Sequence, residues 1–254
     1  MAGTEGPPGF QVEEVTIRVE SLRRDAPALR FAHLSDIHMR ALRPRHEALV
    51  DLIAERKPDF VFLTGDINSH HPATWDLLKE LIGRFAPRHG VFACPGNWEA
   101  GLLLRDSTLK ELAAGAGTEL LINESRTVQT PSGKVRIAGV GDLVAGWPDF
   151  ESALREGRGC DYTILLSHAP LAARFVKEDS GVDLVLSGHT HGGQIRIPVV
   201  WRWFQPSCHG GFPAGLYPMD WGYLYVNRGF GSVGYAPVRF RCPAEVTFFE
   251  VKPG

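Results

Sequence analysis

The sequence lacks a strong excess of charge of either sign, since its 254 residues include 27 basic and 29 acidic side chains. The formal charge of -2 provides no global positive field, so we expect no nucleic-acid partner. Long apolar runs are also missing, because stretches such as FVFL and TILL fall far short of the roughly 20 residues that cross a bilayer. The first ten residues lack the basic and apolar regions of a secretory signal. These absences predict a soluble, cytoplasmic protein.

Cysteine is scarce and scattered. The four cysteines are Cys94, Cys160, Cys208 and Cys242, and no two of them form a C-x-x-C pair. This spacing argues against a zinc knuckle or a disulfide framework. Reduced, structural thiols are the expected state, in keeping with a cytoplasmic protein.

Strand-like and helix-like segments alternate along the chain, which predicts an α/β fold. We expect residues 1–27 to form an N-terminal extension with an edge strand at 15–19, and residues 28–254 to form one domain. Strands are expected at 29–36, 59–66, 90–97, 134–142, 161–170, 183–194 and 245–251. Helices are expected at 46–57, 73–85, 149–156 and 171–178. Open α/β sheets bind ligands beyond the carboxyl ends of their strands, so the residues at those positions are candidates for a site.

Polar side chains of the metal-binding types follow these strands. They are Asp36, His38, Asp66, Asn97, His168, His189 and His191. Taken singly, each has an ordinary structural explanation as a turn residue, a helix cap or a hydrogen-bonded core histidine. Seven such residues at strand ends, several beside glycine, make coincidence the weaker explanation. Seven carboxylate, amide and imidazole ligands suit two divalent ions that share one ligand, and this mixture favours Mn, Fe or Zn, of which we favour Mn.

The motifs SDIH, GD, GN, SH and GHTH, in this order, resemble the five sequence blocks of the calcineurin-like metallophosphoesterases. The resemblance implies a two-sheet α/β sandwich flanked by helices, with a metal-bridging hydroxide as the nucleophile. It implies that Asp66 bridges two ions. Asp36, His38 and His191 would bind the first ion, and Asn97, His168 and His189 would bind the second. The stretches GHTHGGQIRIP, YLYVNRGFG and PVRFRCPAEVTFFEV further resemble a bacterial phosphodiesterase branch that includes a UDP-2,3-diacylglucosamine hydrolase of lipid A synthesis.

One position departs from the family pattern, because Trp98 stands where most members have a histidine that protonates the leaving oxygen. An indole N–H donates a hydrogen bond but does not give up its proton at working pH. We therefore expect pyrophosphate-type or otherwise activated diesters to be cleaved better than simple alkyl ones. Asn97, Trp98, Glu99 and His189 are the candidate catalytic residues, with Glu99 expected to orient the indole.

Three interpretations of the function remain open. The first is a phosphodiesterase that acts on a phosphodiester or nucleotide-lipid substrate. The second is a UDP-2,3-diacylglucosamine pyrophosphohydrolase, and the third is a metal-bound scaffold without turnover. The aromatic-rich segment 201–223 predicts either a peripheral contact with the inner membrane or rings that are packed into the core. His70, His71 and Arg228 are candidates for a contact with the substrate phosphate, and His209 is a candidate for the lining of the pocket. An exposed position or a surface ion pair is the alternative for each.

Overall fold

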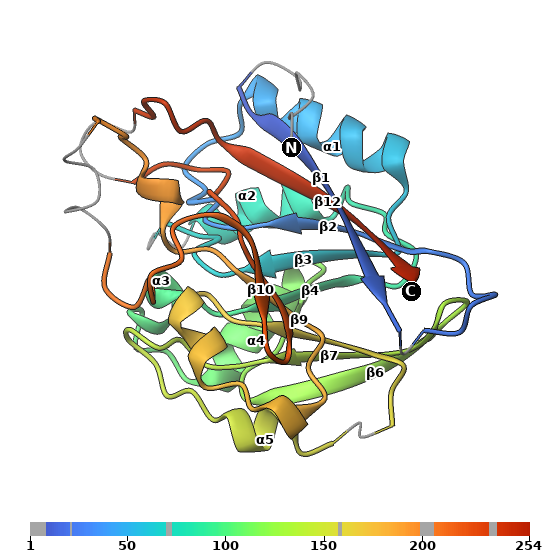
Figure 1. The fold of residues 1–254 in the computed structure, drawn as a ribbon. Coiled ribbons are helices and arrows are strands. Elements are labelled where there is room, and N and C mark those ends of the chain that lie inside the picture. The colour runs from blue at the N-terminus through green and yellow to red at the C-terminus, as the bar shows by residue number, and fades with distance from the viewer. Residues whose placement is uncertain (1–8, 21, 70–72, 157–158, 199–205, 234–237) are drawn as a thin grey trace.

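The computed structural model describes residues 9–20, 22–69, 73–156, 159–198, 206–233 and 238–254 as two mixed six-stranded sheets with helices packed against them (Figure 1). The strand order is β1-β12-β2-β3-β4-β5 in the first sheet and β10-β11-β9-β8-β7-β6 in the second. This architecture confirms the predicted two-sheet α/β sandwich.

The first sheet and its helices come from the N-terminal half of the chain and the last strand. Its strands are β1 (Gln11–Val19), β2 (Leu29–Leu34), β3 (Phe60–Thr64), β4 (Val91–Cys94), β5 (Glu119–Leu120) and β12 (Glu245–Pro253). The helices are α1 (Pro44–Arg56), α2 (Ala73–Ile82), α3 (Asn97–Ala100) and α4 (Asp106–Gly115). Strands β2 to β5 are parallel, and β12 runs antiparallel to β2. Strand β1 pairs with β12 and forms the edge of this sheet, so the predicted edge strand is present.

The second sheet comes from the C-terminal half. Its strands are β6 (Glu124–Thr130), β7 (Gly133–Gly139), β8 (Tyr162–Leu166), β9 (Leu184–Ser187), β10 (Gly215–Met219) and β11 (Gly222–Val226), with helix α5 (Phe150–Leu154) on one side. The helix expected at 171–178 is instead two short 3-10 turns, η1 (Pro170–Arg174) and η2 (Glu178–Ser180). Proline at the first helical position starts η1, and the segment is too short to continue as a stable α-helix. The β10–β11 hairpin was not predicted, because its two strands are rich in glycine, proline and aromatic residues.

Three clusters of buried apolar residues hold the layers together. The cluster between the two sheets contains Phe31, Phe62, Ile137 and Leu166. A second cluster joins the first sheet to its helices, and a third joins the second sheet to α5 and the hairpin. Strands that are buried on both faces explain the nearly continuous apolar runs such as FVFLT in β3.

The parallel strands of both sheets direct their carboxyl ends to one edge of the sandwich. Strands β7, β8, β9 and β11 are parallel to one another, as β2, β3 and β4 are in the first sheet. The turns that follow these strands therefore meet where the two sheets lie face to face. Polar residues that are far apart in the sequence are brought together there.

Candidate metal centre

Each sequence motif ends a strand and places its ligand in the turn that follows. Asp36 and His38 follow β2, Asp66 follows β3, and Asn97 begins α3 after β4. In the second sheet, His168 follows β8, while His189 and His191 follow β9. The structure brings all seven predicted ligands into two adjoining clusters.

The first cluster contains Asp36, His38 and His191, and all three side chains are buried. The Nε2 atoms of His38 and His191 lie 3.2 Å apart. His191 Nε2 lies 3.3 Å from Asp36 Oδ1, a buried oxygen with no hydrogen-bond partner among the described residues. The three side chains direct their ligand atoms to one point.

The second cluster contains Asn97, His168 and His189. Asn97 Oδ1 lies 3.1 Å from His168 Nε2 and 3.1 Å from His189 Nδ1, and the two ring nitrogens are also 3.1 Å apart. Asp66 lies between the clusters, with Oδ2 at 3.7 Å from His38 Nε2 and 3.4 Å from His168 Nε2. This is the grouping that the family resemblance implies.

Hydrogen bonds at the far side of two rings show that the second cluster fits a cation. The other nitrogen of His168, Nδ1, donates to the carbonyl oxygen of Thr64 at 2.8 Å. The other nitrogen of His189, Nε2, donates to the carbonyl oxygen of Ser207 at 2.7 Å. With both rings neutral, as in metal ligands, each imidazole carries one proton, so both nitrogens that face Asn97 Oδ1 present lone pairs. Three lone-pair acceptors about 3 Å apart repel one another unless a positive ion lies among them, so the donor set fits a divalent metal.

The charges and the burial of the site set the pKa values of its histidines. Burial by itself lowers the pKa of His168, but the charge of Asp66 raises it well above its usual value, so a proton or a cation belongs between these two side chains. Burial lowers the pKa of His38 to about 4 and that of His189 to about 4, so both rings are neutral at pH 7. Burial raises the pKa of Asp36 to about 6. Neutral imidazoles and a desolvated carboxylate are the states in which these groups bind a cation.

The backbone at the ligands is strained. Eleven described residues other than glycine have positive φ, and five of them are predicted ligands, with φ between 44° and 69°: Asp36, His38, Asp66, His189 and His191. Such a conformation costs of order 1 kcal/mol or more per residue and persists only where the surrounding structure enforces it. Five of the seven predicted ligands carry this conformational cost, which indicates that the surrounding fold enforces the orientation of their side chains.

Glycines allow the ligand turns to approach one another. A side-chain carbon on Gly96 would collide with the carboxylate of Asp66, and one on Gly188 would collide with Asp36 and Ser35. Only a residue without Cβ fits at either position.

Glu99 holds the turn that carries Asp66. Its buried carboxylate accepts hydrogen bonds from the backbone N–H groups of Asp66, Ile67, Asn68 and Gly96, at 2.8 to 3.2 Å, and from the side-chain amide of Asn68 at 3.0 Å. These contacts connect the third sequence block to the second. The expectation that Glu99 orients the indole of Trp98 stays a prediction.

Trp98 lies against a ligand of the first cluster. Its indole meets the His38 ring edge to face, with 4.5 Å between the ring centroids, and its backbone N–H donates to Asp66 Oδ1 at 2.9 Å. Trp98 also lines a groove of about 310 Å³ that opens over both clusters. The other lining residues are Asp66, Asn97, His189, Thr190, His191, Gly193, Gln194, Pro206 and Val233.

Two arginines lie near the site, of which Arg228 was a candidate phosphate contact and Arg239 was not assigned a role from the sequence. Arg239 Nη2 lies 3.3 Å from His191 Nδ1 and donates to the carbonyl oxygens of Arg228 and Gly229, so it supports the loop beside Asp36. Nothing in the local sequence around Arg239 indicates this role. Arg228 is paired with Glu13 and Glu245 at the start of β1 and β12. Its guanidinium therefore has a structural role, and Arg228 is not among the described residues that line the groove.

The other histidines discussed from the sequence are not among the described residues of the two ligand clusters. His33 is fully buried, with Nε2 at 2.9 Å from Thr64 Oγ1, as expected for a core histidine. His209 is half-buried and accepts from the backbone N–H of Gly211. His70, His71 and residues 201–205 of the aromatic segment lie outside the described residues.

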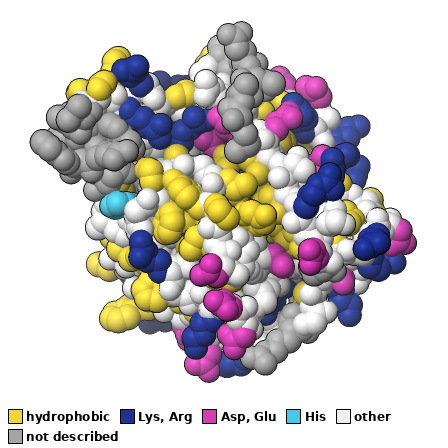
Figure 2. All heavy atoms as spheres, in the orientation of Figure 1, with side chains coloured by type: hydrophobic (Ala, Val, Ile, Leu, Met, Phe, Trp, Pro, Cys, Tyr) yellow, Lys and Arg dark blue, Asp and Glu magenta, His cyan; other side chains and the backbone are white. Residues whose placement is uncertain are grey.

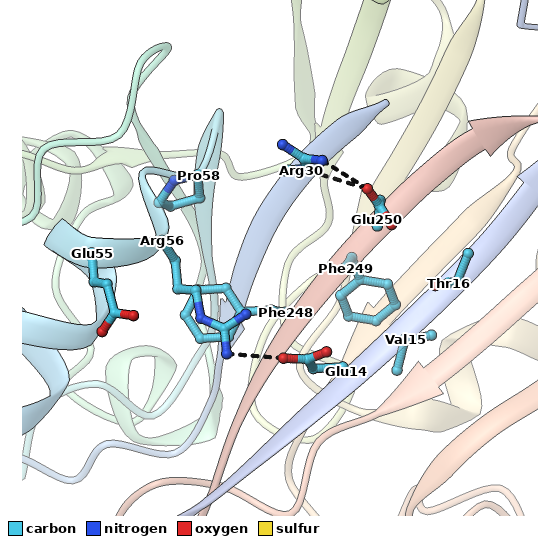
Figure 3. Close-up of a pocket in the computed structure, with 10 residues that line it drawn as sticks. All are labelled: Glu14, Val15, Thr16, Arg30, Glu55, Arg56, Pro58, Phe248, Phe249 and Glu250. Atoms are coloured by element: carbon cyan, nitrogen blue, oxygen red, sulfur yellow. Dashed lines mark hydrogen bonds and ion pairs between the residues drawn. The ribbon is translucent and has the colours of Figure 1, made fainter. Parts of the chain in front are cut away.

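A larger hollow, of about 360 Å³, lies away from the ligands. Figure 3 shows its lining, in which Arg56 lies over Phe248 and pairs with Glu14, while Arg30 pairs with Glu250. The charged side chains that meet across this hollow neutralise one another. We therefore assign the chemistry to the groove over the ligands.

The described aromatic residues of segment 206–223 are half-buried. Phe212, Tyr217 and Trp221 pack against the third core cluster, and the Trp221 indole donates to the carbonyl oxygen of Ala173 at 3.2 Å. Figure 2 shows hydrophobic side chains gathered at the centre of the view, over the β10–β11 hairpin. Among the described residues, no helix combines the length and the apolar character that a membrane span requires.

Comparison with known proteins agrees with this geometry. A sequence profile of the calcineurin-like phosphoesterases matches residues 29–193. The chain is 31% identical over 252 residues to the metallophosphoesterase YkuE of Bacillus subtilis, covering 96% of this chain and 86% of that protein. It is 30% identical over 253 residues to the phosphodiesterase YaeI of Escherichia coli, covering 96% and 89%.

A solved structure shares the fold at low identity. The sulfate thiohydrolase SoxB of Thermus thermophilus superposes with a TM-score of 0.54 and 14% identity, over 88% of this chain and 56% of that one. Profile, relatives and ligand clusters together identify a metal-dependent phosphoric ester hydrolase, whose homologues include a phosphodiesterase. The chain belongs to the calcineurin-like phosphoesterase family.

Proposed function

We propose that the chain hydrolyses pyrophosphate-type and other activated phosphodiester bonds, using two divalent ions held by its seven ligands. The observation that supports this most directly is the pair of adjoining clusters, with Asp66 Oδ2 within 3.7 Å of ligand nitrogens from both. When bound, two such ions would polarise the phosphoryl oxygens and lower the pKa of a bridging water. Imidazole mixed with carboxylate favours Mn, Fe or Zn, and Mn is our first choice.

The residues that line the groove support the proposal that pyrophosphate-type and other activated bonds are cleaved. Apart from metal ligands, the described residues that line it are Trp98, Thr190, Gly193, Gln194, Pro206 and Val233, none of which releases a proton near neutral pH. An alkoxide leaving group, whose conjugate acid has a pKa near that of water at about 15.7, requires protonation or a metal. A departing phosphate, with its last pKa near about 6, leaves as an anion.

A narrower candidate is the pyrophosphate bond of UDP-2,3-diacylglucosamine, a nucleotide-lipid substrate. Trp98 favours it for the reason just given, and so does the resemblance of the C-terminal third of the chain. In this proposal the enzyme works in the cytoplasm at the inner membrane. The segment 201–223 would provide a peripheral contact there.

The first experiment measures Mn-dependent hydrolysis of bis-p-nitrophenyl phosphate. This diester has an activated leaving group, so the missing acid does not mask turnover. We expect activity in the wild type, loss of it in His189→Ala, and retention in His89→Ala. His89 is a matched control because it precedes β4 at the opposite edge of the sheet.

If wild type and His189→Ala were equally inert while the wild type still held two ions, the result would instead support the metal-bound scaffold. Absence of Mn binding in the wild type would contradict the assignment of the ligands.

A second experiment tests whether Trp98 makes the enzyme prefer activated bonds. Trp98→His restores an imidazole at this position, and we expect it to raise the rate on an alkyl diester relative to an aryl diester. Trp98→Phe, which keeps an aromatic ring without an acid, should leave that ratio unchanged. An unchanged ratio in Trp98→His would refute the argument from the leaving group.

A further inference from the structure

Most of the exposed large hydrophobic side chains lie around the metal centre. The described residues include nine of them, and eight lie in the loops at the carboxyl edge of the two sheets. The first apolar patch consists of Ile195, Ile197, Val238 and Phe240, and the second of Leu103, Leu104, Val144 and Trp147. The ninth side chain, Phe175, packs against Phe150 of α5.

The first apolar patch is built on a short ribbon beside the first ligand cluster. Ile195 and Phe240 form a parallel bridge, in which the N–H of Arg196 donates to Phe240 O and the N–H of Phe240 donates to Gln194 O, both at 2.9 Å. Gln194 also lines the groove over the ligands. Backbone pairing therefore fixes Ile195 and Phe240 next to the groove, and Ile197 and Val238 lie two residues along the chain from them. The four side chains are 44 to 57% exposed.

The second apolar patch lies on the other side of α3. Leu103 is 91% exposed and Trp147 is 90% exposed, and both line a hollow of about 240 Å³ together with Ala100 at the end of α3. Asn97 and Trp98, at the start of the same helix, line the groove over the ligands. The groove is thus flanked by apolar side chains on both sides of the ligand turns.

The segments around the first apolar patch are rich in arginine, although the whole chain carries -2. Residues 190–244 contain five arginines and one acidic residue, Asp220, and residues 37–46 contain three arginines and no acidic residue. Arg40, Arg43 and Arg241 are exposed. Figure 2 shows hydrophobic and Lys or Arg side chains together at the upper left, over loops drawn in orange and red in Figure 1.

We propose that this edge docks onto an anionic lipid surface, with both apolar patches in the headgroup region and the metal groove facing the lipid phosphates. Apolar and aromatic side chains partition into that region, and arginines beside them are attracted to anionic headgroups. The proposal rests on the proposed phosphodiesterase activity and narrows its substrate to a phosphoester carried at a membrane surface. It adds these two patches, which are separate from segment 201–223, to the peripheral contact proposed for that segment.

Flotation with vesicles tests the docking. Wild-type protein should bind vesicles of equal phosphatidylcholine and phosphatidylglycerol more tightly than vesicles of phosphatidylcholine alone. The double variant Leu103→Ser, Trp147→Ser should lower the partition coefficient by about tenfold or more, because two side chains leave the apolar region. Arg241→Glu should lower binding to the mixed vesicles alone, by about fivefold or more.

The control is Phe175→Ser, which removes an exposed aromatic residue that lies outside both patches. It should bind as the wild type does. All variants should keep their hydrolysis of the soluble aryl diester, so a loss of docking is distinguished from a failure of the proposed function. Equal binding by wild type and patch variants, or no vesicle binding by the wild type, overturns the proposal. A wild-type dimer that the patch variants dissociate also overturns it, since the patches would then form a contact between copies.

Discussion

Replacement of Glu99 by glutamine changes one atom and should loosen the turn that carries Asp66. Oε1 of Glu99 accepts from Ile67 N, Asn68 N and Asn68 Nδ2, and Oε2 accepts from the N–H groups of Asp66 and Gly96, both at 2.8 Å. Glutamine replaces one of these oxygens with an NH2 group, which is a donor. Whichever way the amide turns, at least two buried donors then face another donor.

The loss can be estimated from the contacts. A buried donor left without an acceptor costs about 1 to 3 kcal/mol, so two of them give about 2 to 6 kcal/mol of destabilisation. The matched control is Glu47→Gln, because Glu47 also accepts two hydrogen bonds, at 2.7 and 2.9 Å, but from the exposed Arg84. Surface pairs of this kind contribute about 0 to 1 kcal/mol.

Urea unfolding in the presence of a chelator measures the free energy of unfolding without the contribution of bound metal. A second titration with Mn, followed by the shift in Tm, measures how well the displaced turn still binds the ion. We expect Glu99→Gln to lose both stability and the Mn-induced shift, and Glu47→Gln to keep both. A loss below about 1 kcal/mol in Glu99→Gln would refute the reasoning, since that is the expected effect of a surface pair.

Burial lowers the pKa of His33 to about 3, so the unfolded chain takes up a proton there below pH 6.5 while the folded chain does not. The stability that the neutral ring contributes is therefore present at neutral pH and falls by about 2 kcal/mol between pH 7 and pH 5. His33→Gln should reduce the pH dependence of urea unfolding in chelator by about this amount, while the part due to His38 and His189 stays. Gly96→Ala should abolish Mn binding in calorimetry because its Cβ would collide with Asp66, whereas Gly115→Ala, with open space at its Cβ, should bind Mn normally. Asp66→Asn should lower metal affinity by more than the about 10 to 100-fold typical of outer-shell changes, and unchanged metal content by mass spectrometry would contradict its shared position.

The succession of strands along the chain, and the polar residues that gather at their ends, could be predicted from the sequence. Strands such as FVFLT are apolar throughout because both of their faces are buried, and their polar residues come where burial ends. The glycines beside Asp66 and Asn97 mark turns that need a backbone without Cβ. Local patterns of this kind depend only on residues that are close together in the sequence, so they can be recognised before the fold is known.

The β10–β11 hairpin and the short turns after β8 were harder to predict, because they depend on contacts with residues that are distant in the sequence. Segment 215–226 forms strands because β11 pairs with β9, whose partner residues lie some forty positions earlier in the chain. Segment 171–178 has a helical pattern, but only short 3-10 turns form there. Tertiary contacts override local propensity in both segments.

By itself, the sequence determined which residue types stand at the strand ends, and through them the family and its metal chemistry. The tertiary structure decided which atoms meet: Asn97 with His189, 92 positions away, and Glu99 with the turn of Asp66. It also decided which ring nitrogens face the site, through the carbonyl oxygens of Thr64 and Ser207. The apolar patches around the groove became visible only in three dimensions, because exposure depends on the packing of the whole chain.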